Sequence, residues 1–305
     1  MNIPDIDLLN KNHSIKTDSS SLHFTSGPGD IPLVNIQNKH ASAVISLQGA
    51  HLLSWIPKGQ KDVIWLSDDA SFKPGKSVRG GIPICWPWFG VHNNSSYPAH
   101  GFARTVNWQI INTADLPTTE TQITFKLETD QLPENLQQMW PNKTTVEYIV
   151  TVGNNLTLEL ITHNESNQAI TIGQALHTYF NVENINDVTA HGLDNKSYLD
   201  KPDGFKQKKQ AGPITVTEEV DRVYLDTIDD VIIDNRKRKI SISKQGSAST
   251  VVWNPWKEIA EKMGDLGKDG YTVMLCVESA NAAEDVRTID AGDHHKLSVI
   301  YKITG

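Results

Sequence analysis

Apolar and polar residues alternate with a period of two along much of this 305-residue chain, and this alternation restricts the folds that it can adopt. In residues 121–128, for example, Ile123, Phe125 and Leu127 alternate with polar neighbours. Successive side chains of a strand point to opposite faces of a sheet, so this pattern is typical of half-buried strands. The same pattern recurs in residues 145–152, 156–162, 239–243, 249–254, 271–278 and 296–303.

Helical periodicity is rare. Residues 256–264 place Trp256, Ile259, Ala260 and Met263 at helical spacing, and residues 129–140 could hold a further helical turn. Strands do not alternate regularly with helices, which argues against a parallel nucleotide-binding sheet. We therefore expect an all-β fold, a large antiparallel β-sandwich with few short helices.

The strand pattern runs evenly, without an internal repeat, a change of composition or a Pro/Gly/Ser-rich linker. We therefore expect one domain over residues 1–305, with its core in 31–303 and a loose N-terminal segment in 1–20. Residues 200–212 are mostly polar and contain four lysines, and we expect them, like the first dozen residues, to form an exposed, mobile loop.

Composition excludes several classes of protein. No stretch of about 18 apolar residues occurs, so we expect no membrane span, and the first residues lack a secretory signal pattern, which favours the cytoplasm. Cys85 and Cys276 are the only cysteines and are predicted to be buried free thiols. The net charge of −8 argues against nucleic acid as a partner, so an anionic ligand would depend on a few local arginines.

Arginine, glycine and aromatic residues are concentrated in residues 77–90, SVRGGIPICWPWFG. Glycine lets a backbone approach a ligand closely, and the aromatic rings could stack on a sugar or simply pack in the core. Arg79 has no evident structural role in this sequence and is a candidate ligand-binding residue. Residues 98–104, PAHGFAR, place His100 and Arg104 on one short turn. Arginine suits phosphate because its planar group donates hydrogen bonds in pairs.

Two further segments place polar groups on predicted strands. In residues 170–180, alternation puts His177 on the face opposite the core, together with Gly173 and Ala175, whose small side chains leave space. In residues 271–281, Glu278 likewise lies opposite the core face, and a buried carboxylate requires a partner. A hydrogen-bonded structural histidine and a solvated strand end are the alternative interpretations.

Other motifs point to no metal and no cofactor. His294 and His295 are adjacent, so on a strand they face opposite sides and cannot hold one metal together. The chain lacks HExxH, a cysteine–histidine cluster, a P-loop, GxGxxG and GxSxG.

The segments around Arg79, His100, His177 and Glu278, in this order and spacing, resemble the hexose-6-phosphate branch of the aldose 1-epimerase family. The resemblance runs from about residue 31 to the C-terminus. It implies a galactose-mutarotase-like β-supersandwich whose site lies on a concave face.

The same resemblance assigns roles to individual residues. His177 is similar in position to the family's catalytic acid and Glu278 to its catalytic base. The residues that it implies for substrate binding are Arg79, Arg104, Asp221 and His100. Ala99 stands where some members have a glutamine that contacts the ligand, so that contact is absent or supplied elsewhere.

The implied reaction is exchange of the α and β anomers of a hexose 6-phosphate, most simply glucose 6-phosphate, by acid–base ring opening and closure. This reaction needs no cofactor, and we expect the protein to act as a monomer. One alternative is a non-catalytic β-sandwich that binds carbohydrate or sugar phosphate. Another is a glycoside-cleaving sandwich, which would require two carboxylates flanking the bond.

Overall fold

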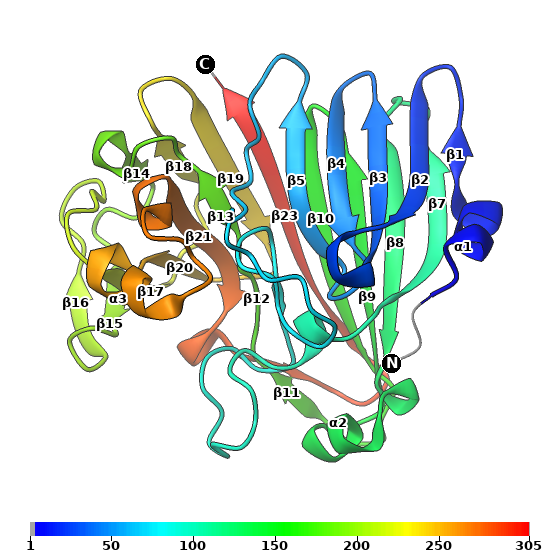
Figure 1. Cartoon of the computed structure of the whole chain (residues 1–305). Helices are drawn as coiled ribbons and strands as arrows, with labels where there is room; N and C mark the ends of the chain where they lie inside the picture. Colours follow the sequence, from blue (N-terminus) through cyan, green and yellow to red (C-terminus); the bar gives the residue numbers. More distant parts are fainter. Residues whose placement is uncertain (1–3, 305) are drawn as a thin grey trace.

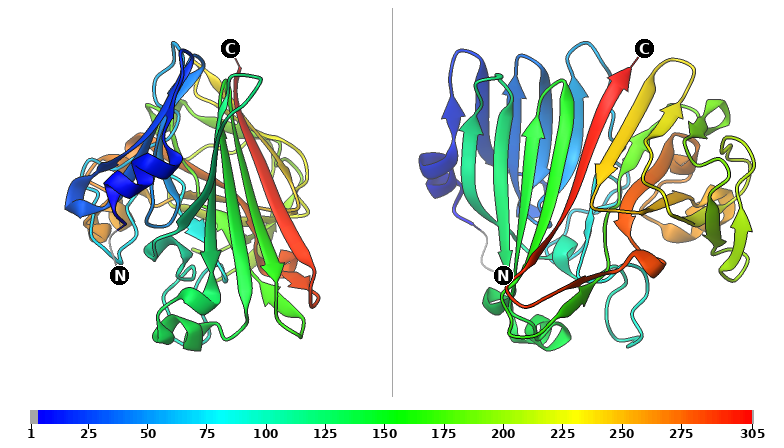
Figure 2. Two further views of the ribbon diagram at one scale, coloured as in Figure 1. Left: turned by 90° about the vertical axis from the view of Figure 1, so that its right-hand side faces the viewer. Right: turned by 180° about the vertical axis from the view of Figure 1, so that it is seen from behind.

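The computed structural model describes residues 4–304 and consists mainly of antiparallel strands (Figure 1). One five-stranded sheet has the order β1-β2-β3-β4-β5. Its strands are β1 (Ile15–Lys16), β2 (Ser20–Ser26), β3 (Pro32–Asn38), β4 (Ala41–Ser46) and β5 (His51–Pro57). This sheet faces the long strands of a larger sheet, and the two form the layers of a sandwich (Figure 2).

The larger sheet has eight strands in the order β14-β18-β19-β23-β10-β9-β8-β7. Their bounds are β7 (Gln109–Asp115), β8 (Thr121–Glu128), β9 (Thr144–Val152), β10 (Asn155–Asn164), β14 (Thr189–His191), β18 (Val231–Asp234), β19 (Lys239–Gln245) and β23 (His294–Thr304). One continuous apolar core joins this sheet to the five-stranded sheet.

A second eight-stranded sheet lies beside the sandwich and has the order β16-β15-β17-β20-β21-β12-β6, with β13 also paired to β21. Its strands are β6 (Ile84–Cys85), β12 (Gln174–Leu176), β13 (Tyr179–Asn181), β15 (Ser197–Asp200), β16 (Lys206–Lys209), β17 (Val220–Leu225), β20 (Ser249–Asn254) and β21 (Met274–Asn281). A short pair, β11 (Ile170–Ile172) with β22 (Arg287–Ile289), completes the described strands.

The period-two pattern correctly predicted the main strands and their buried faces. Strand β8 spans the predicted residues and buries Ile123, Phe125 and Leu127. In β9 the buried face includes Val146, Tyr148, Val150 and Val152. The all-β class is confirmed: the apolar sides of the sheets pack together and bury these alternate side chains in one core.

The predicted strand over residues 170–180 is interrupted. It is divided into β11, β12 and β13, with His177 and Thr178 between the last two. The backbone N–H of His177 donates to the carbonyl of Pro83, and that of Tyr179 donates to the carbonyl of Gly81. The chain therefore leaves its regular pairing at the histidine to follow the loop that carries the two glycines.

Helices are short. Both predicted helical segments are confirmed, as α2 (Glu134–Met139) and α3 (Trp256–Met263). A third, α1 (Ile6–His13), forms where we expected a loop, because Asp5 caps its first turn by accepting from two backbone N–H groups. Among residues 4–304 we find no helix long and apolar enough to cross a membrane.

Two loop predictions were wrong in part. The N-terminal segment is held by α1, where Asn10 hydrogen-bonds both the N–H and the carbonyl of Phe24, and by β1 pairing with β2. Residues 1–3 lie outside the described part of the chain. Residues 206–209 form strand β16, which pairs with β15 as an edge hairpin. Its lysines suit an edge strand, since charge discourages further pairing.

Candidate active site

The candidate site lies on one face of the second eight-stranded sheet. Strand pairing aligns Asp221 of β17 with Trp253 of β20, Trp253 with Cys276 of β21, and Cys276 with Tyr179 of β13. Directly paired residues project from the same face of a sheet. Glu278 projects from that face too, because it lies two residues after Cys276 on β21.

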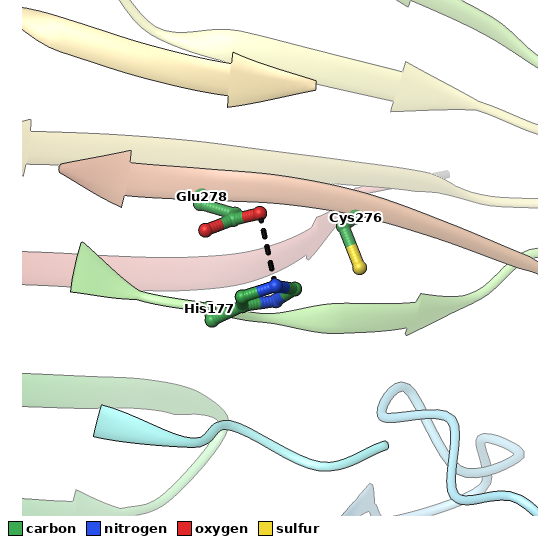
Figure 3. A group of neighbouring side chains, drawn as sticks. All are labelled: His177, Cys276 and Glu278. Atoms are coloured by element: carbon green, nitrogen blue, oxygen red, sulfur yellow. Dashed lines mark ion pairs between the residues drawn. The ribbon is translucent and has the colours of Figure 1, made fainter. Parts of the chain in front are cut away.

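The structure brings His177 and Glu278 together. The alternation in their two segments places each of them on the face opposite the core. Nε2 of His177 lies 3.4 Å from Oε1 of Glu278 (Figure 3). The histidine ring stacks on Tyr179, with ring centroids 4.9 Å apart, and Trp253 meets its edge. Both residues are buried, and within the described structure Nδ1 of His177 and Oε2 of Glu278 have no hydrogen-bond partner.

Burial acts on the two groups in opposite directions. Burial, with the nearby charge of Asp221, raises the pKa of Glu278 well above its ordinary value. Burial also lowers the pKa of His177 well below its ordinary value, and His100, Arg104 and Arg79 lower it further. Both shifts favour the neutral forms, so the proton that the pair can share is favoured on Glu278 over His177.

His100 lies on the same face as the pair. Its ring centroid is 5.8 Å from that of His177 and 4.9 Å from that of Phe89. Burial, together with the charges of Arg104, Lys201 and Arg79, lowers the pKa of His100 to about 3. It is therefore a neutral imidazole at physiological pH, suited to hydrogen bonding with a hydroxyl group.

A strained turn holds His100 in place. His100 and Gly101 both have left-handed backbone conformations, with φ of 66° and 70°. The N–H of His100 donates to the carbonyl of Gly90, and that of Phe102 donates to the carbonyl of Trp86. A Cβ at residue 101 would overlap the Trp86 carbonyl group, so only glycine fits this turn.

The two arginines have different surroundings. Nη2 of Arg104 donates to the carbonyl of Ala99 at 2.8 Å, and its charge acts on His100, His177 and Glu278. Arg79 is bound more closely: its Nε pairs with Asp265 at 3.0 Å and its Nη1 donates to the Tyr179 hydroxyl at 3.0 Å. Our view that Arg79 lacks a structural role was therefore wrong. The sequence did not indicate its partner because Asp265 lies far along the chain.

The glycines beside Arg79 also act differently from our expectation. A Cβ on Gly80 would lie 2.6 Å from the carbonyl oxygen of Trp65, and a Cβ on Gly81 would overlap the ring of His51. Nε2 of His51 in turn bonds the Gly80 carbonyl at 2.8 Å. The close approach that these glycines permit is therefore to the protein's own chain. Trp86 is likewise fully buried in the core and cannot stack on a ligand.

Asp221 carries a partner that sequence reasoning missed. Nζ of Lys201 lies 2.5 Å from Oδ2 of Asp221, and the lysine side chain is 51% exposed. The charge of Lys201 lowers the pKa values of His100 and Glu278, so this cation also acts at the site. Lys201 directly follows β15, and no motif in its segment indicated such a position.

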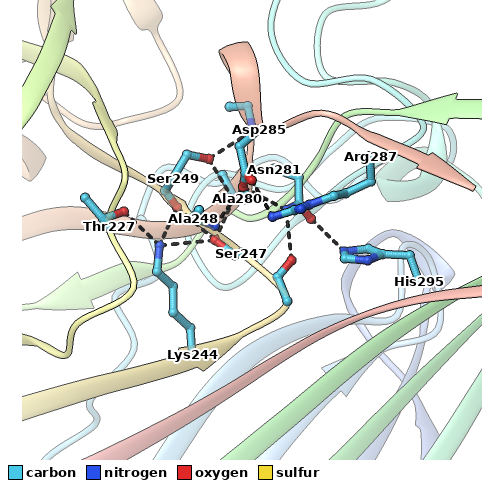
Figure 4. Close-up of polar contacts among 12 residues, drawn as sticks. Thr227, Lys244, Ser247, Ala248, Ser249, Ala280, Asn281, Asp285, Arg287 and His295 are labelled. Carbon is cyan, nitrogen blue, oxygen red and sulfur yellow. Dashed lines mark hydrogen bonds and ion pairs between the residues drawn. The ribbon is translucent and has the colours of Figure 1, made fainter.

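A buried polar network supports the end of β21. Nζ of Lys244 donates to the Ser249 carbonyl at 2.5 Å, while the Ser249 hydroxyl donates to the Ala280 carbonyl at 2.7 Å (Figure 4). Asn281 donates to the Gly246 carbonyl at 2.9 Å. Burial lowers the pKa of Lys244 to about 7. These bonds fix the strand immediately after Glu278.

Residues 32–302 match the sequence pattern of the family described as aldose 1-epimerase. The chain belongs to the aldose 1-epimerase family. Two relatives are described by more specific names. An Escherichia coli K12 protein, provisionally named glucose-6-phosphate 1-epimerase, is 36% identical over 84% of this epimerase and 85% of its own length. A similarly named protein of Cenchrus ciliaris is also 36% identical, over 84% of this chain and 79% of its own.

Solved structures show the same fold. YeaD of Salmonella typhimurium, provisionally described as a mutarotase, superposes on the epimerase with a TM-score of 0.86 at 31% identity, covering 98% of this chain and 99% of its own. Galactose 1-epimerase of Lactobacillus acidophilus has a TM-score of 0.69 at 13% identity, over 93% of this chain and 98% of its own. The expected galactose-mutarotase-like fold is confirmed.

The turn at Gly101 gives a first prediction about the epimerase. Gly90 and Gly101 both have left-handed conformations, but nothing lies within 4 Å of a Cβ on Gly90. Gly90→Ala should therefore lower the free energy of unfolding by about 1–2 kcal/mol, from backbone strain alone. Gly101→Ala should cost about 1–3 kcal/mol more, because the added methyl group overlaps the chain. Urea denaturation measures both, and equal losses would contradict the close approach.

The buried carboxyl of Glu278 gives a second prediction. Its pKa is raised on folding, so its contribution to stability is complete below pH 4.5 and is lost as pH rises toward the folded-state pKa. Glu278→Gln has no carboxyl group to ionise, so it does not lose stability in this way as the pH rises. The variant should gain stability relative to wild type by up to about 1.4 kcal/mol per pH unit above pH 4.5.

Urea denaturation at pH 4, 6 and 8 measures the difference between the two proteins. Glu258→Gln, at an exposed site on α3, is the control and should show no such trend. A difference between wild type and Glu278→Gln that stays constant with pH would show that the carboxyl is already ionised in the folded protein.

Proposed function

We propose that this epimerase interconverts the α and β anomers of a hexose 6-phosphate, with glucose 6-phosphate as the first substrate to test. The observation that carries the proposal is the buried contact of 3.4 Å between His177 and Glu278. Each side chain retains one buried polar atom without a partner within residues 4–304, as expected of groups that meet a substrate. The names of the relatives in Escherichia coli and Cenchrus ciliaris support the choice of sugar phosphate.

Anomer exchange requires a base at the C1 hydroxyl and an acid at the ring oxygen. We assign Glu278 as the base and His177 as the acid, and ring closure reverses both transfers. Burial raises the pKa of Glu278 and so favours its neutral form in the free protein. The reactive form contains the same number of protons. It arises when the shared proton crosses the 3.4 Å contact from Glu278 to His177.

The cations near the pair support the choice of an anionic sugar. Arg104, Arg79 and Lys201 all lower the pKa of His100, so their charges converge on one region of an otherwise acidic protein. We propose that Arg104 and Arg79 bind the phosphate group. Lys201 can join them by exchanging its ion pair with Asp221 for the phosphate. Asp221 is then free to accept a hydrogen bond from a sugar hydroxyl.

We further propose that the chain acts as one domain and as a monomer in the cytoplasm. The contacts His177–Glu278 and Lys201–Asp221 form within a single chain, so the proposed site needs no second subunit. Cys85 and Cys276 are both free and buried, which is consistent with a reducing compartment.

The third prediction tests the acid–base pair. Glu278→Gln and His177→Ala should each lower the rate of anomer exchange by at least about 10²-fold, because each removes one proton transfer. Exchange NMR on α- and β-glucose 6-phosphate measures the rate, and shifts of the sugar resonances show that binding persists. Wild-type protein that shifts the resonances without accelerating exchange would instead be a carbohydrate-binding module.

The fourth prediction tests the phosphate contacts. Charge-assisted hydrogen bonds contribute roughly 1.5–3 kcal/mol, so Arg104→Ala should lower kcat/KM for glucose 6-phosphate by about 10–100-fold. The slow reaction of free glucose should change little. Lys201→Ala should show the same selectivity with a smaller loss, because its side chain is half exposed.

Lys206→Ala is the matched control for Lys201→Ala. Lys206 lies on the same hairpin and pairs with Asp203 at 2.8 Å. Lys206→Ala should leave the rates with glucose and with glucose 6-phosphate unchanged. Equal losses on glucose and glucose 6-phosphate in the Arg104 variant would mean that the arginine shapes the site without binding phosphate.

A further inference from the structure

The fold collects three different metal-binding groups at one point of the site. Each of His177, Cys276 and Glu278 offers one donor atom, and these nitrogen, sulfur and oxygen atoms lie within 4.8 Å of one another (Figure 3). All three residues are buried. We propose that they form a binding site for a soft divalent cation such as Zn²⁺ or Cd²⁺, and that its occupancy inhibits the enzyme. The inhibition rests on the proposed function, whereas the binding does not.

Sequence spacing could not have indicated this site. His177 lies about a hundred residues before the other two groups, and none of the usual short zinc motifs is present. Strand pairing creates the cluster instead. Cys276 and Glu278 project from the same face of β21, and β13, which pairs with β21 at Tyr179 and Cys276, starts two residues after His177.

The distances suit a small tetrahedral ion. With zinc bonds of about 2.0–2.3 Å, neighbouring ligand atoms in a tetrahedral site lie about 3.4–3.6 Å apart. Nε2 of His177 and Oε1 of Glu278 are already 3.4 Å apart. The remaining separations, of at most 4.8 Å, need a side-chain adjustment of about one ångström.

The immediate surroundings favour binding. Nδ1 of His177 and Oε2 of Glu278 have no hydrogen-bond partner in the described chain, so coordination can break few existing bonds. Tyr179, Trp253 and His100 hold the histidine ring in position. Such support from the surrounding groups is what orients the ligands in natural metal sites.

The donor types select the ion. Zinc and cadmium accept imidazole, thiolate and carboxylate together, whereas Mg²⁺ and Ca²⁺ require a larger set of oxygen ligands. Binding displaces the thiol proton of Cys276 to solvent, together with any proton on Glu278. The thiolate and the carboxylate then offset the two positive charges of the ion, so a neutral group is buried. Three protein ligands leave a fourth position for water or a sugar hydroxyl.

Occupancy would stop the proposed reaction. A metal on the imidazole nitrogen prevents that atom from carrying a proton to the ring oxygen. The same ion engages the Glu278 carboxylate, which can then no longer accept a proton from the C1 hydroxyl. Anomer exchange is therefore expected to be fully active in metal-free protein and to fall as the site fills.

The test uses EDTA-treated full-length protein. Titration with Zn²⁺ should show one bound ion per chain by calorimetry, and Co²⁺ should give the thiolate-to-cobalt absorption band that requires a cysteine ligand. In exchange NMR with glucose 6-phosphate, the rate should fall with Zn²⁺ occupancy and return when EDTA is added. Activity that requires the added ion would overturn the inhibitory role.

The two cysteines provide a matched pair of variants. Cys276→Ser should weaken Zn²⁺ binding by at least about 100-fold, because even supporting residues around a metal contribute 10–100-fold to affinity. Cys85→Ser, at the other buried thiol, should bind as wild type does. Each variant is compared with its own metal-free rate, and circular dichroism verifies folding.

The outcomes separate the two proposals. Absence of the cobalt–thiolate band in wild type would overturn the metal site without the use of any variant. Equal Zn²⁺ affinity in wild type and Cys276→Ser would overturn it as well. A cobalt band and Cys276-dependent binding in a protein without anomerase activity would support the metal site and refute the proposed function.

Discussion

The imidazole of His177 and the carboxyl of Glu278 contact each other in a region buried from water. Each group still has one buried polar atom, Nδ1 or Oε2, without a hydrogen-bond partner in the described chain. A carboxyl group is costly to bury unless it is neutral or well paired. The protein meets this condition by placing Glu278 on β21, a strand whose residues are buried along its whole length. The histidine is placed opposite it by an interruption between β12 and β13.

This arrangement requires a rigid frame. Ring stacking on Tyr179 fixes the plane of the imidazole, and the hydrogen bonds of Arg79 and Asp265 fix Tyr179 in turn. On the far side of Glu278, the network around Lys244 fixes the end of β21. The contact between His177 and Glu278 therefore lies where several elements meet, and these elements are secured by bonds that involve neither residue.

The sequence predicted the strands well because period-two alternation is a local signal. Ile123, Phe125 and Leu127 needed only their neighbours in the chain to show which face of β8 is buried. His177 and Glu278 could be assigned to faces for the same reason. The family resemblance then identified them as a pair.

What the sequence could not predict was set by contacts between distant residues. The pairing of Arg79 with Asp265, and that of Lys201 with Asp221, have no local signature. The same holds for the position of Cys276 beside His177 and Glu278. The α1 helix was not predicted because its eight residues carry a weak apolar pattern, although Asp5 is a favourable N-cap residue.

Arg104 and Lys201 lie on peripheral segments, whereas Glu278 of the proposed acid–base pair lies in the sheet. Arg104 lies on a short 3₁₀ turn and Lys201 follows the end of β15 at an edge hairpin, whereas Glu278 lies in the middle of the sheet. Surface loops tolerate replacement far better than buried strands do. On the roles proposed for Arg104 and Lys201, related proteins could therefore come to accept another charged sugar, or a neutral one, through changes in these two peripheral segments. The proposed acid–base pair would be inherited unchanged, so substrate preference could diverge in this fold while the reaction stays the same.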